Sequence, residues 1–373
     1  MDENWDKVLY ESIPLFKDAS SKEDYHHEIY RLTNRLQDTH TSLPPSIDEI
    51  VSGPFRPNFR MMNLRDTFVI SSIRFPDNNT ENFKPGDIVL RVDGEDVHKL
   101  YDSLQAFTGG GNYWSKQRFV CNAVLSRQDS ITVFTIMRDT DTLIIYSNNR
   151  KAWDMHQHKL SIERENEKSV LYRWVNDSVA YLDLTSATPK NFRKNFSPIK
   201  NAKAIIIDLR CYPHTHLIQN LANCFVPPKS LFAYATYADA RFPGMLRQHQ
   251  TSNYIGKKNY FKGKVIVLVN ELTESYSEYL TMLLQTNPKT ITVGGASSGA
   301  NGNISTLEFP GRVKTIYSGI GIYYPGMIQT QRVGVKVDYI TEPTVESLKK
   351  GVDVAFEKAV DLTLQQKLRD NLN

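Results

Sequence analysis

The stretch "VIVLVNELTESYSEYLTMLL", residues 265–284, decides the fold class. Its first five residues, Val265–Val269, are all apolar, which predicts a strand buried on both faces. A polar turn follows, and the apolar residues between Tyr279 and Leu284 recur at helical spacing. A buried strand that passes through a short turn into a helix is the repeating unit of α/β folds.

Similar apolar runs occur before and after this stretch, at 179–184 ("VAYLDL"), 204–209 ("AIIIDL") and 290–293 ("TITV"). Helix-like sequences near 215–224 and 275–286 lie between them. The alternation predicts an α/β core with a mixed, largely parallel sheet. Residues 347–368 are expected to close the chain as one amphipathic helix.

The first part of the chain has a different pattern. Residues 20–37 predict a helix that begins with a capping box formed by Ser20 and Glu23. Its apolar stripe comprises Tyr25, Ile29, Leu32 and Leu36. Residues 51–150 have short alternating segments separated by Gly, Asn and Asp turns, and "KPGDIVLRVDGEDV" (84–97) predicts a β-hairpin. We therefore expect three parts: a helical segment at 1–50 that packs on the core, a β-rich domain at 51–150, and the α/β core at 151–373.

The composition is that of an ordinary globular protein. The 373 residues are 40% hydrophobic and 23% charged, and the net charge of +4 comes from scattered Lys and Arg, so no nucleic-acid partner is expected. No apolar run approaches the roughly 20 residues of a membrane helix. The opening "MDENWDK" lacks a signal-peptide pattern, and we expect that Met1 stands where a leader has been removed. Three cysteines are too few for a disulfide framework and fit reduced core thiols.

Ser275 and Ser277 lie where the turn becomes a helix. The unpaired N–H groups and positive dipole at a helix N-terminus can stabilise a developing oxyanion, so a serine at this place suits a nucleophile. Serine is also a preferred N-cap. There is no G-x-S-x-G motif, which argues against an α/β-hydrolase. The local pattern leaves the nucleophile and the cap open.

A nucleophilic serine needs a base, and His40 in "QDTHTSL" lies in a loop just after the first predicted helix. Because catalytic groups usually come from separate segments, its distance in sequence from Ser275 is no objection. His26 and His27 are expected on an exposed helix face. The pairs His156/His158 and His214/His216 lack an acidic or thiol partner, so no metal site is expected.

Together these segments resemble one family. The blocks "AIIIDLR", "GKVIVLVNELTESYSEYL", "ITVGGASSGANGNIS" and "RVGVKVDYITEPTVESLKKGVDVAFEKAVDL" occur in the order found in the C-terminal processing peptidases, or tail-specific proteases. "DTHTSL" resembles an Asp-x-His-Thr segment of that family, and "FKPGDIVLRVDGEDVHKL" resembles half of a PDZ domain. "DLRCYP", "SGIGIYYP" and "TQRVG" are similar to members from Bacteroidetes. The resemblance implies a ClpP/crotonase-like core that carries a PDZ-like domain.

The resemblance also implies catalytic roles. The family's nucleophile precedes a glutamate by three residues, and here these are Ser275 and Glu278. Many members use a Ser–Lys dyad, but Ala300 takes the lysine's place in "GGASSGAN". Tricorn-type and chlamydial relatives instead use a distant histidine, which matches His40, and a late glutamate, whose place Gln331 takes.

Three further residues, Thr39, Tyr276 and Cys211, follow from the resemblance, and Asp38 follows from its closeness to His40 in the sequence. Thr39 stands where tricorn-type proteases have a serine beside the histidine. The oxyanion hole would use the N–H of Tyr276 and an N–H near Cys211. Asp38 is a second candidate acid.

The sequence thus predicts a serine endopeptidase that cleaves unstructured polypeptides without a cofactor or metal, in the cell envelope, periplasm or outside the cell. The alternative is a weak or inactive peptide-binding relative. The missing lysine, Gln331 and the glycine-poor "DLRCYP" favour that alternative. The oligomeric state is left open.

Overall fold

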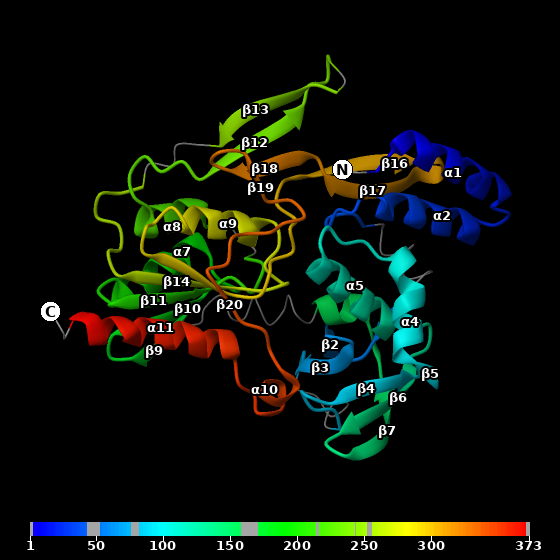
Figure 1. Ribbon diagram of the computed structural model, residues 1–373, viewed down its shortest axis with the longest axis horizontal. Helices are drawn as coiled ribbons and strands as arrows, with labels where there is room; N and C mark the ends of the chain where they lie inside the picture. The colour runs from blue at the N-terminus through cyan, green and yellow to red at the C-terminus, as the bar shows by residue number, and fades with distance from the viewer. Residues whose placement is uncertain are drawn as a thin grey trace. The chain divides into compact units, whose positions relative to one another are not determined.

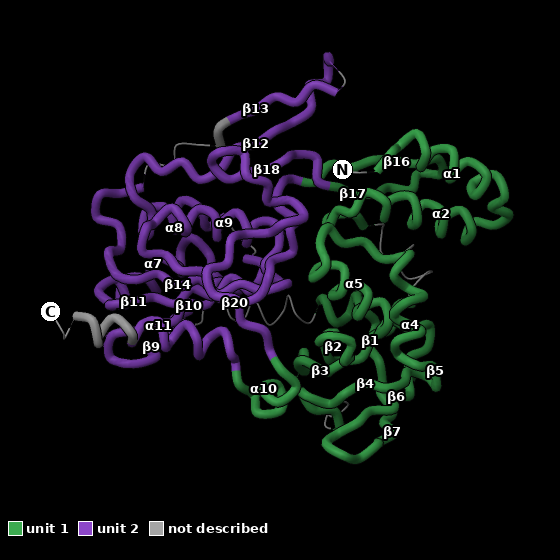
Figure 2. Tube along the Cα trace, viewed as in Figure 1, with its two compact units in different colours: residues 1–157, 304–317, 344–352 green, residues 158–303, 318–343, 353–373 purple. Residues whose placement is uncertain are grey.

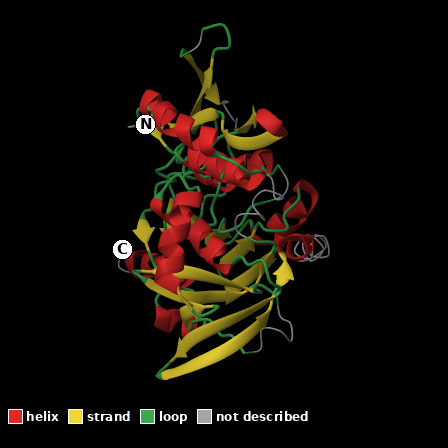
Figure 3. Cartoon of the chain, turned by 90° about the vertical axis from the view of Figure 1, so that its right-hand side faces the viewer, coloured by secondary structure: helices red, strands yellow, loops and turns green. Residues whose placement is uncertain are grey.

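The computed structural model describes residues 3–42, 53–75, 82–157, 171–213, 216–242, 244–251 and 256–370. Helices and strands are mixed in it (Figure 3). The chain divides into two compact units, each assembled from separate segments (Figure 2). Unit 1 comprises residues 1–157, 304–317 and 344–352, and unit 2 comprises residues 158–303, 318–343 and 353–373. The division into three domains at residues 50 and 150 stays a prediction.

Unit 2 is built on a six-stranded sheet in the order β20-β15-β14-β11-β10-β9. The strands are β9 (Tyr172–Asn176), β10 (Val179–Asp183), β11 (Ala204–Asp208), β14 (Lys264–Val269), β15 (Thr290–Gly294) and β20 (Tyr339–Ile340). All neighbours are parallel except β9, which runs antiparallel to β10. The predicted mixed, largely parallel sheet of an α/β core is confirmed.

Helices cover both faces of this sheet (Figure 1). Ile205 and Ile207 of β11 pack in a cluster with residues of α7 (Pro189–Ile199), α8 (Ile218–Phe225) and α9 (Tyr276–Leu284). Ile206, between them, packs in another cluster with residues of α11 (Val354–Asp370). Because successive side chains of a strand point to opposite faces, a strand between two helix layers must be apolar at every position.

A second, antiparallel sheet of unit 2 has the order β13-β12-β18-β19. Its strands are β12 (Ala233–Ala238), β13 (Leu246–Thr251), β18 (Ile320–Tyr324) and β19 (Ile328–Gln329). The short strand β19 leads into the segment that carries Gln331.

Unit 1 contains a six-stranded sheet with the path β2-β3-β4-β6-β7, in which β5 pairs with β4. The strands are β2 (Phe59–Leu64), β3 (Thr67–Ile73), β4 (Ile88–Val92), β5 (Glu95–Asp96), β6 (Ile131–Arg138) and β7 (Asp141–Asn148), while β1 (Phe55–Arg56) pairs with β8 (Arg150–Lys151). The hairpin predicted at 84–97 is present, and both turn residues, Asp93 and Gly94, have positive φ. Sequence reasoning missed α4 (Val97–Leu104), η1 (Gln105–Phe107) and α5 (Tyr113–Leu125).

The N-terminal helices α1 (Trp5–Asp18) and α2 (Lys22–Asn34) also belong to unit 1, together with β16 (Ile304–Phe309), η2 (Pro310–Arg312) and β17 (Val313–Ser318). The capping box of α2 is formed by Ser21 and Asp24, one residue later than predicted.

His26 is only 2% exposed, so the expectation that it is solvated is wrong. Burial lowers the pKa of its imidazole, because the interior disfavours the charged form.

The C-terminal region contains two helices where the sequence predicted one. α10 (Val345–Lys349) ends before Gly351, which has a φ of 64°, and α11 begins at Val354. Glycine adopts that φ without steric cost, which allows the chain to leave the first helix. Asp353, just before α11, receives two hydrogen bonds from Arg210 at 2.8 and 2.7 Å. Arg210 also bonds to Asp208 at the end of β11.

Within the described parts of the chain, no helix has both the length and the apolar character needed to cross a membrane.

Candidate active site

Three loops of unit 2 leave the carboxyl ends of three adjacent parallel strands. The loop after β11 carries Cys211, the turn after β14 carries Ser275, and the loop after β15 carries residues 295–303. Because the strands are parallel and in register, these loops emerge at the same edge of the sheet. In α/β folds that edge is where ligands bind.

Ser275 occupies a strained corner between the turn and α9. Its φ of 52° and ψ of −107° lie in a region that non-glycine residues rarely adopt, and α9 begins at the next residue, Tyr276. A strained backbone of this kind costs roughly 1–3 kcal/mol and concentrates at functional sites. A plain N-cap needs only an extended backbone, as at Ser21 (φ −128°) and Thr188 (φ −117°) in this chain.

Ser277 has a different place from Ser275. It is fully buried, and its hydroxyl donates to the carbonyl oxygen of Cys211. This bond ties the first turn of α9 to the loop after β11. The two serines of the motif are therefore distinct, since Ser277 is a packing residue and Ser275 stands at the corner.

Glu278 lies in the interior beneath this corner, with 0% of its surface exposed. Its Oε2 accepts from the N–H groups of Ser275 (3.1 Å) and Ala300 (2.8 Å). Its Oε1 accepts from the hydroxyl of Ser297 (2.6 Å) and the N–H of Gly299 (2.8 Å). Burial raises the pKa of this carboxyl to about 7, and the four hydrogen bonds act in the opposite direction.

The loop after β15 packs closely against the segment that carries Gln331. Gly299 has a φ of 64°, and a Cβ there would come within 2.9 Å of the backbone of Arg332. The N–H of Arg332 donates to the carbonyl of Gly299 at 2.8 Å. Ala300, in the place of the lysine, is buried and donates its N–H to Glu278. Glu278 and this loop therefore link the Ser275 corner to residues 331–332.

Gln331 is half-buried, and its Nε2 donates to the carbonyl of Ile320 at 3.1 Å. This bond fixes the orientation of the amide, which leaves Oε1 as the side-chain group able to accept a hydrogen bond. An amide oxygen can orient an imidazole by accepting its N–H, although it provides no negative charge.

The two predicted oxyanion-hole positions flank the corner. Tyr276 is the first residue of α9, and its hydroxyl accepts from the N–H groups of Leu217 (2.7 Å) and Ile218 (3.0 Å). These bonds join the start of α9 to the start of α8. Cys211 is held through its carbonyl by Ser277. Neither Cys211 nor Tyr212 has a positive φ, so this turn forms without glycine.

The loop of His40 belongs to unit 1 and is fixed from two sides. Thr39 is 3% exposed; its hydroxyl donates to Ser115 (3.0 Å) and accepts from the N–H of Gly111 (2.8 Å). On the other side, the carbonyl of Ser42 accepts from Thr315 and Ile316 of β17. His40 itself is half-buried.

Asp38 shapes the turn that presents His40. Its Oδ1 accepts from the N–H of His40 at 3.1 Å, and its carbonyl accepts from the N–H of Thr41 at 3.0 Å. This is an Asx-type turn, in which the carboxylate bonds to the backbone two residues on. The contact involves the main chain of His40.

Comparison with known proteins shows what this part of the chain is similar to. The model of peptidase family S41 matches residues 178–341. This stretch is therefore similar to members of that family. It contains Ser275, Tyr276, Cys211 and Gln331, and it confirms the resemblance to C-terminal processing peptidases.

Solved structures share the fold at low identity. A mutant of CPAF has a TM-score of 0.72 at 13% identity, covering 97% of this chain and 92% of that chain. Mature CPAF complexed with lactacystin has a TM-score of 0.67 at 13% identity, covering 99% and 94%. A candidate peptidase from Parabacteroides merdae has a TM-score of 0.55 at 15% identity, covering 97% and 90%. No curated protein sequence matches the chain.

Four of the six predicted site residues lie in unit 2, whereas Thr39 and His40 lie in unit 1. The pairing of Ser275 with His40 and the roles of Gln331 and Thr39 stay predictions.

Sequence reasoning missed the buried network of Glu278. The only available signal for it was the small, polar composition of "GGASSGAN", because glycine and serine allow the backbone to approach a buried carboxylate.

The segment "GGGN" (109–112) is more than a flexible break in the chain. A Cβ on Gly111 would lie 2.9 Å from Thr39 Oγ1, and one on Gly109 would lie 3.2 Å from the carbonyl of Thr41. The glycines thus allow this segment to lie against the His40 loop.

The histidine pairs are not gathered into a metal site in the described residues. Of the paired histidines, His158 and His214 lie outside the described residues. The described residues contain no group of three His, Cys, Asp or Glu that could hold a metal.

Proposed function

We propose that the protein is a serine endopeptidase that cleaves unstructured polypeptides, with Ser275 as the nucleophile and His40 as the base. The backbone of Ser275 carries this proposal, because its positive φ at the carboxyl edge of the sheet distinguishes it from an ordinary helix cap. The S41 domain around it supports the same chemistry.

In the proposed reaction, Ser275 Oγ attacks the carbonyl carbon of the scissile peptide bond as His40 takes its proton. The tetrahedral oxyanion accepts hydrogen bonds from the N–H of Tyr276 and an N–H near Cys211. His40 then gives the proton to the leaving amine, and the acyl group stays on Ser275. Water then gives a proton to His40 and attacks the acyl carbonyl carbon. His40 passes that proton to the departing Ser275 Oγ, which releases the acyl group as a carboxylic acid and restores the serine.

Gln331 is proposed to orient His40 by accepting an imidazole N–H at its Oε1. Its amide is already fixed by the bond from Nε2 to Ile320, which supports a positioning role. Because an amide stabilises an imidazolium less than a carboxylate does, a relative with glutamate at this place should be faster. The exchange Gln331→Glu tests this expectation directly through kcat.

The PDZ-like domain is proposed to hold the substrate as an added strand at a sheet edge. β2 and β7 are the edge strands of the sheet in unit 1, which supports this type of capture. The proposed location is the cell envelope, as the family resemblance implies.

A fluorophosphonate probe tests the chemistry, because it labels only an activated serine. We expect labelling of the wild type and loss of labelling in Ser275→Ala and in His40→Ala. Ser103→Ala and His98→Ala, which change exposed side chains elsewhere, are the matched controls and should label normally. A wild type that does not label and does not cleave casein would favour the inactive peptide-binding relative.

A further inference from the structure

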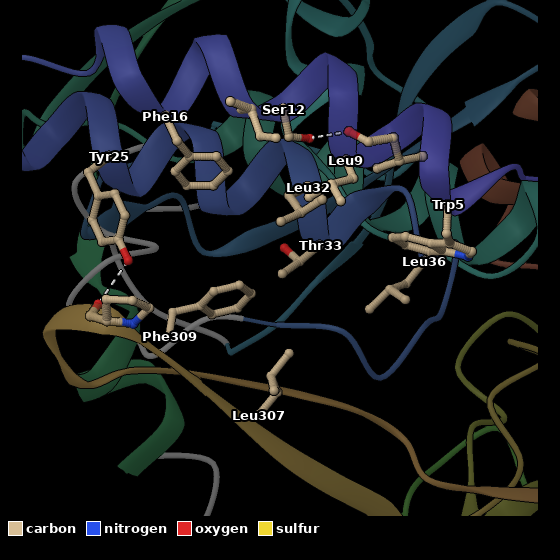
Figure 4. A pocket seen from close by; sticks show the side chains of 13 residues that line it. Trp5, Leu9, Ser12, Phe16, Tyr25, Leu32, Thr33, Leu36, Leu307 and Phe309 are labelled. Carbon is tan, nitrogen blue, oxygen red and sulfur yellow. Dashed lines mark hydrogen bonds between the residues drawn. The ribbon is translucent and has the colours of Figure 1, made fainter. Parts of the chain in front are cut away.

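A cavity of about 630 Å³ lies in unit 1 between α1, α2 and the hairpin of β16 and β17 (Figure 4). α1 contributes residues at helical spacing, and α2 contributes residues of the apolar stripe seen in the sequence. The full lining is Trp5, Val8, Leu9, Ser12, Ile13, Phe16, Tyr25, Leu32, Thr33, Leu36, Leu307, Phe309 and Pro310. The volume is within the range of about 300–1,000 Å³ typical of small-molecule sites.

The hydroxyl groups of the lining all donate within the cavity wall. Ser12 donates to the carbonyl of Val8 (2.7 Å), and Thr33 donates to that of Ile29 (2.8 Å). Tyr25 donates to the carbonyl of Pro310 at 2.9 Å. Trp5 adds an indole N–H on a side chain that is 38% exposed. A polar group placed deep in the cavity would lose its hydration and find few partners, because the lining hydroxyls already donate their protons to carbonyl groups of the protein.

Interactions at both ends of α1 fix the walls of the cavity. Arg35, just after α2, forms ion pairs with Glu3 and Glu11. At the other end, the rings of Phe16 and Tyr25 pack edge to face with their centroids 5.7 Å apart. The bond from Tyr25 to Pro310 then attaches this end to the hairpin. The cavity is therefore part of the folded architecture, since its two helices and its hairpin are joined around it.

The apolar side chains at the mouth remain in water. Leu9 is 57% exposed and Ile13 is 54% exposed, although both line the cavity. An apolar occupant would cover them and gain the hydrophobic free energy of that surface. A peptide backbone would bring N–H and C=O groups that need partners, whereas a hydrocarbon brings none.

We propose that this cavity binds one unbranched hydrocarbon chain, the acyl chain of a fatty acid or lipid, with the head group outside. None of the lining residues is proposed for catalysis, and the inference does not depend on peptidase activity. Because the wall is mostly apolar, affinity depends on chain length and little on the head group.

Displacement of cis-parinaric acid from the full-length protein measures this binding. We expect octanoic, decanoic and dodecanoic acids to bind about fourfold more tightly for each added methylene, since burying one CH₂ contributes about 0.8 kcal/mol. The gain should stop once the chain fills the cavity. Dodecanol and dodecylphosphocholine should match dodecanoic acid within about threefold, because only the chain enters the cavity. A strong preference for one head group would contradict a site that recognises the hydrocarbon chain alone. Absence of saturable binding would overturn the proposal.

Charged substitutions on two walls provide the matched variants. Leu9→Asp on α1 and Leu307→Asp on β16 place a carboxylate at the lining, and each should weaken dodecanoic acid at least about tenfold. Tyr10→Asp and Ile304→Asp change exposed residues of the same elements outside the lining and should bind as the wild type does. Equal affinity in all four variants would place the binding elsewhere and overturn the proposal.

Two further measurements keep the test decisive if a variant folds poorly. A bromine-labelled dodecanoic acid should quench tryptophan fluorescence in the wild type and much less in Trp5→Phe, because bromine quenches on contact. Quenching unchanged in Trp5→Phe contradicts the proposal. Sedimentation of the wild type tests the competing occupant, a second copy of the chain. A dimer that Leu9→Asp and Leu307→Asp dissociate and that dodecanoic acid leaves intact would also overturn it.

Discussion

The backbone N–H of Ser275 donates to Oε2 of Glu278, 3.1 Å away and three residues later in the chain. The same oxygen accepts the N–H of Ala300, the residue in the place of the family's lysine. One buried carboxylate thus holds the strained corner and the loop after β15 together. The position of the proposed nucleophile depends on this carboxylate as well as on the strand and helix that flank it.

Replacing Ser275 by glycine should give a more stable protein than replacing it by alanine. Alanine keeps the steric cost of a φ of 52°, whereas glycine adopts that φ freely. We expect Ser275→Gly to exceed Ser275→Ala by about 1–2 kcal/mol in the free energy of unfolding. Urea denaturation of the two variants measures the difference.

The same pair of substitutions at Ser277 is the control. Ser277 lies inside α9, where glycine is less favourable than alanine by about 1 kcal/mol. The order should therefore reverse, with Ser277→Ala more stable than Ser277→Gly. Alanine ranking above glycine at both positions would mean that the corner at Ser275 is not strained.

Glu278→Gln should lower both stability and activity. Four donors face the two carboxylate oxygens, and glutamine keeps only one oxygen, so two donors would face an NH₂ group. We expect a loss of about 2–4 kcal/mol in the free energy of unfolding at neutral pH. Peptidase activity should fall at least about tenfold as the corner relaxes. Glu346→Gln, an exposed residue of α10, should leave both quantities unchanged.

The raised pKa of Glu278 predicts opposite pH trends for stability and activity. Its pKa is about 7 in the folded protein, against roughly 4.3 for an ordinary glutamate. Between these values the folded state holds a proton that the unfolded state has released, so stability falls as pH rises toward 7. The stabilising contribution is complete below the lower value and is lost through the upper one.

Activity should rise over the same range, because the four donors suit the ionised carboxylate and because a histidine base must be neutral. Unfolding free energies between pH 5 and 8 should fall less steeply in Glu278→Gln than in the wild type. Parallel slopes would show that another group controls the pH dependence.

The sequence predicted the α/β core well, for a physical reason. β11 and β14 lie between two helix layers, so their burial demands unbroken apolar runs, and those runs are visible without a structure. The helix α5 was missed because its residues, "YWSKQRFVCNAVL", follow "GGGN" and bury polar Ser115 and Gln117 together with its apolar face. That mixture weakens the helical pattern.

The site was predictable only in part. Ser275 and His40 came from ordered motifs, but the backbone strain at Ser275 depends on φ and ψ, which no residue type reports. The sequence predicts a solvated His26 on an exposed helix face, yet α2 turns it inward. Burial of a single polar residue depends on tertiary packing, which the sequence of one helix does not specify.

Gly111→Ala should perturb the His40 loop through Thr39. The new Cβ would lie 2.9 Å from Thr39 Oγ1, so the hydroxyl that accepts the N–H of Gly111 must move. We expect a loss of about 1–2 kcal/mol in stability and a fall in kcat larger than any rise in KM. In a Thr39→Ala background the clash is absent, so the stability cost should shrink by at least about 0.5 kcal/mol. Gly94→Ala provides the control, because Gly94 has a positive φ but no atom lies within 4 Å of the Cβ that alanine would add. The stability cost of Gly94→Ala should be the same with Thr39 and with alanine at position 39. If Gly111→Ala and Thr39→Ala are additive, the two segments are not coupled and "GGGN" does not shape the His40 loop.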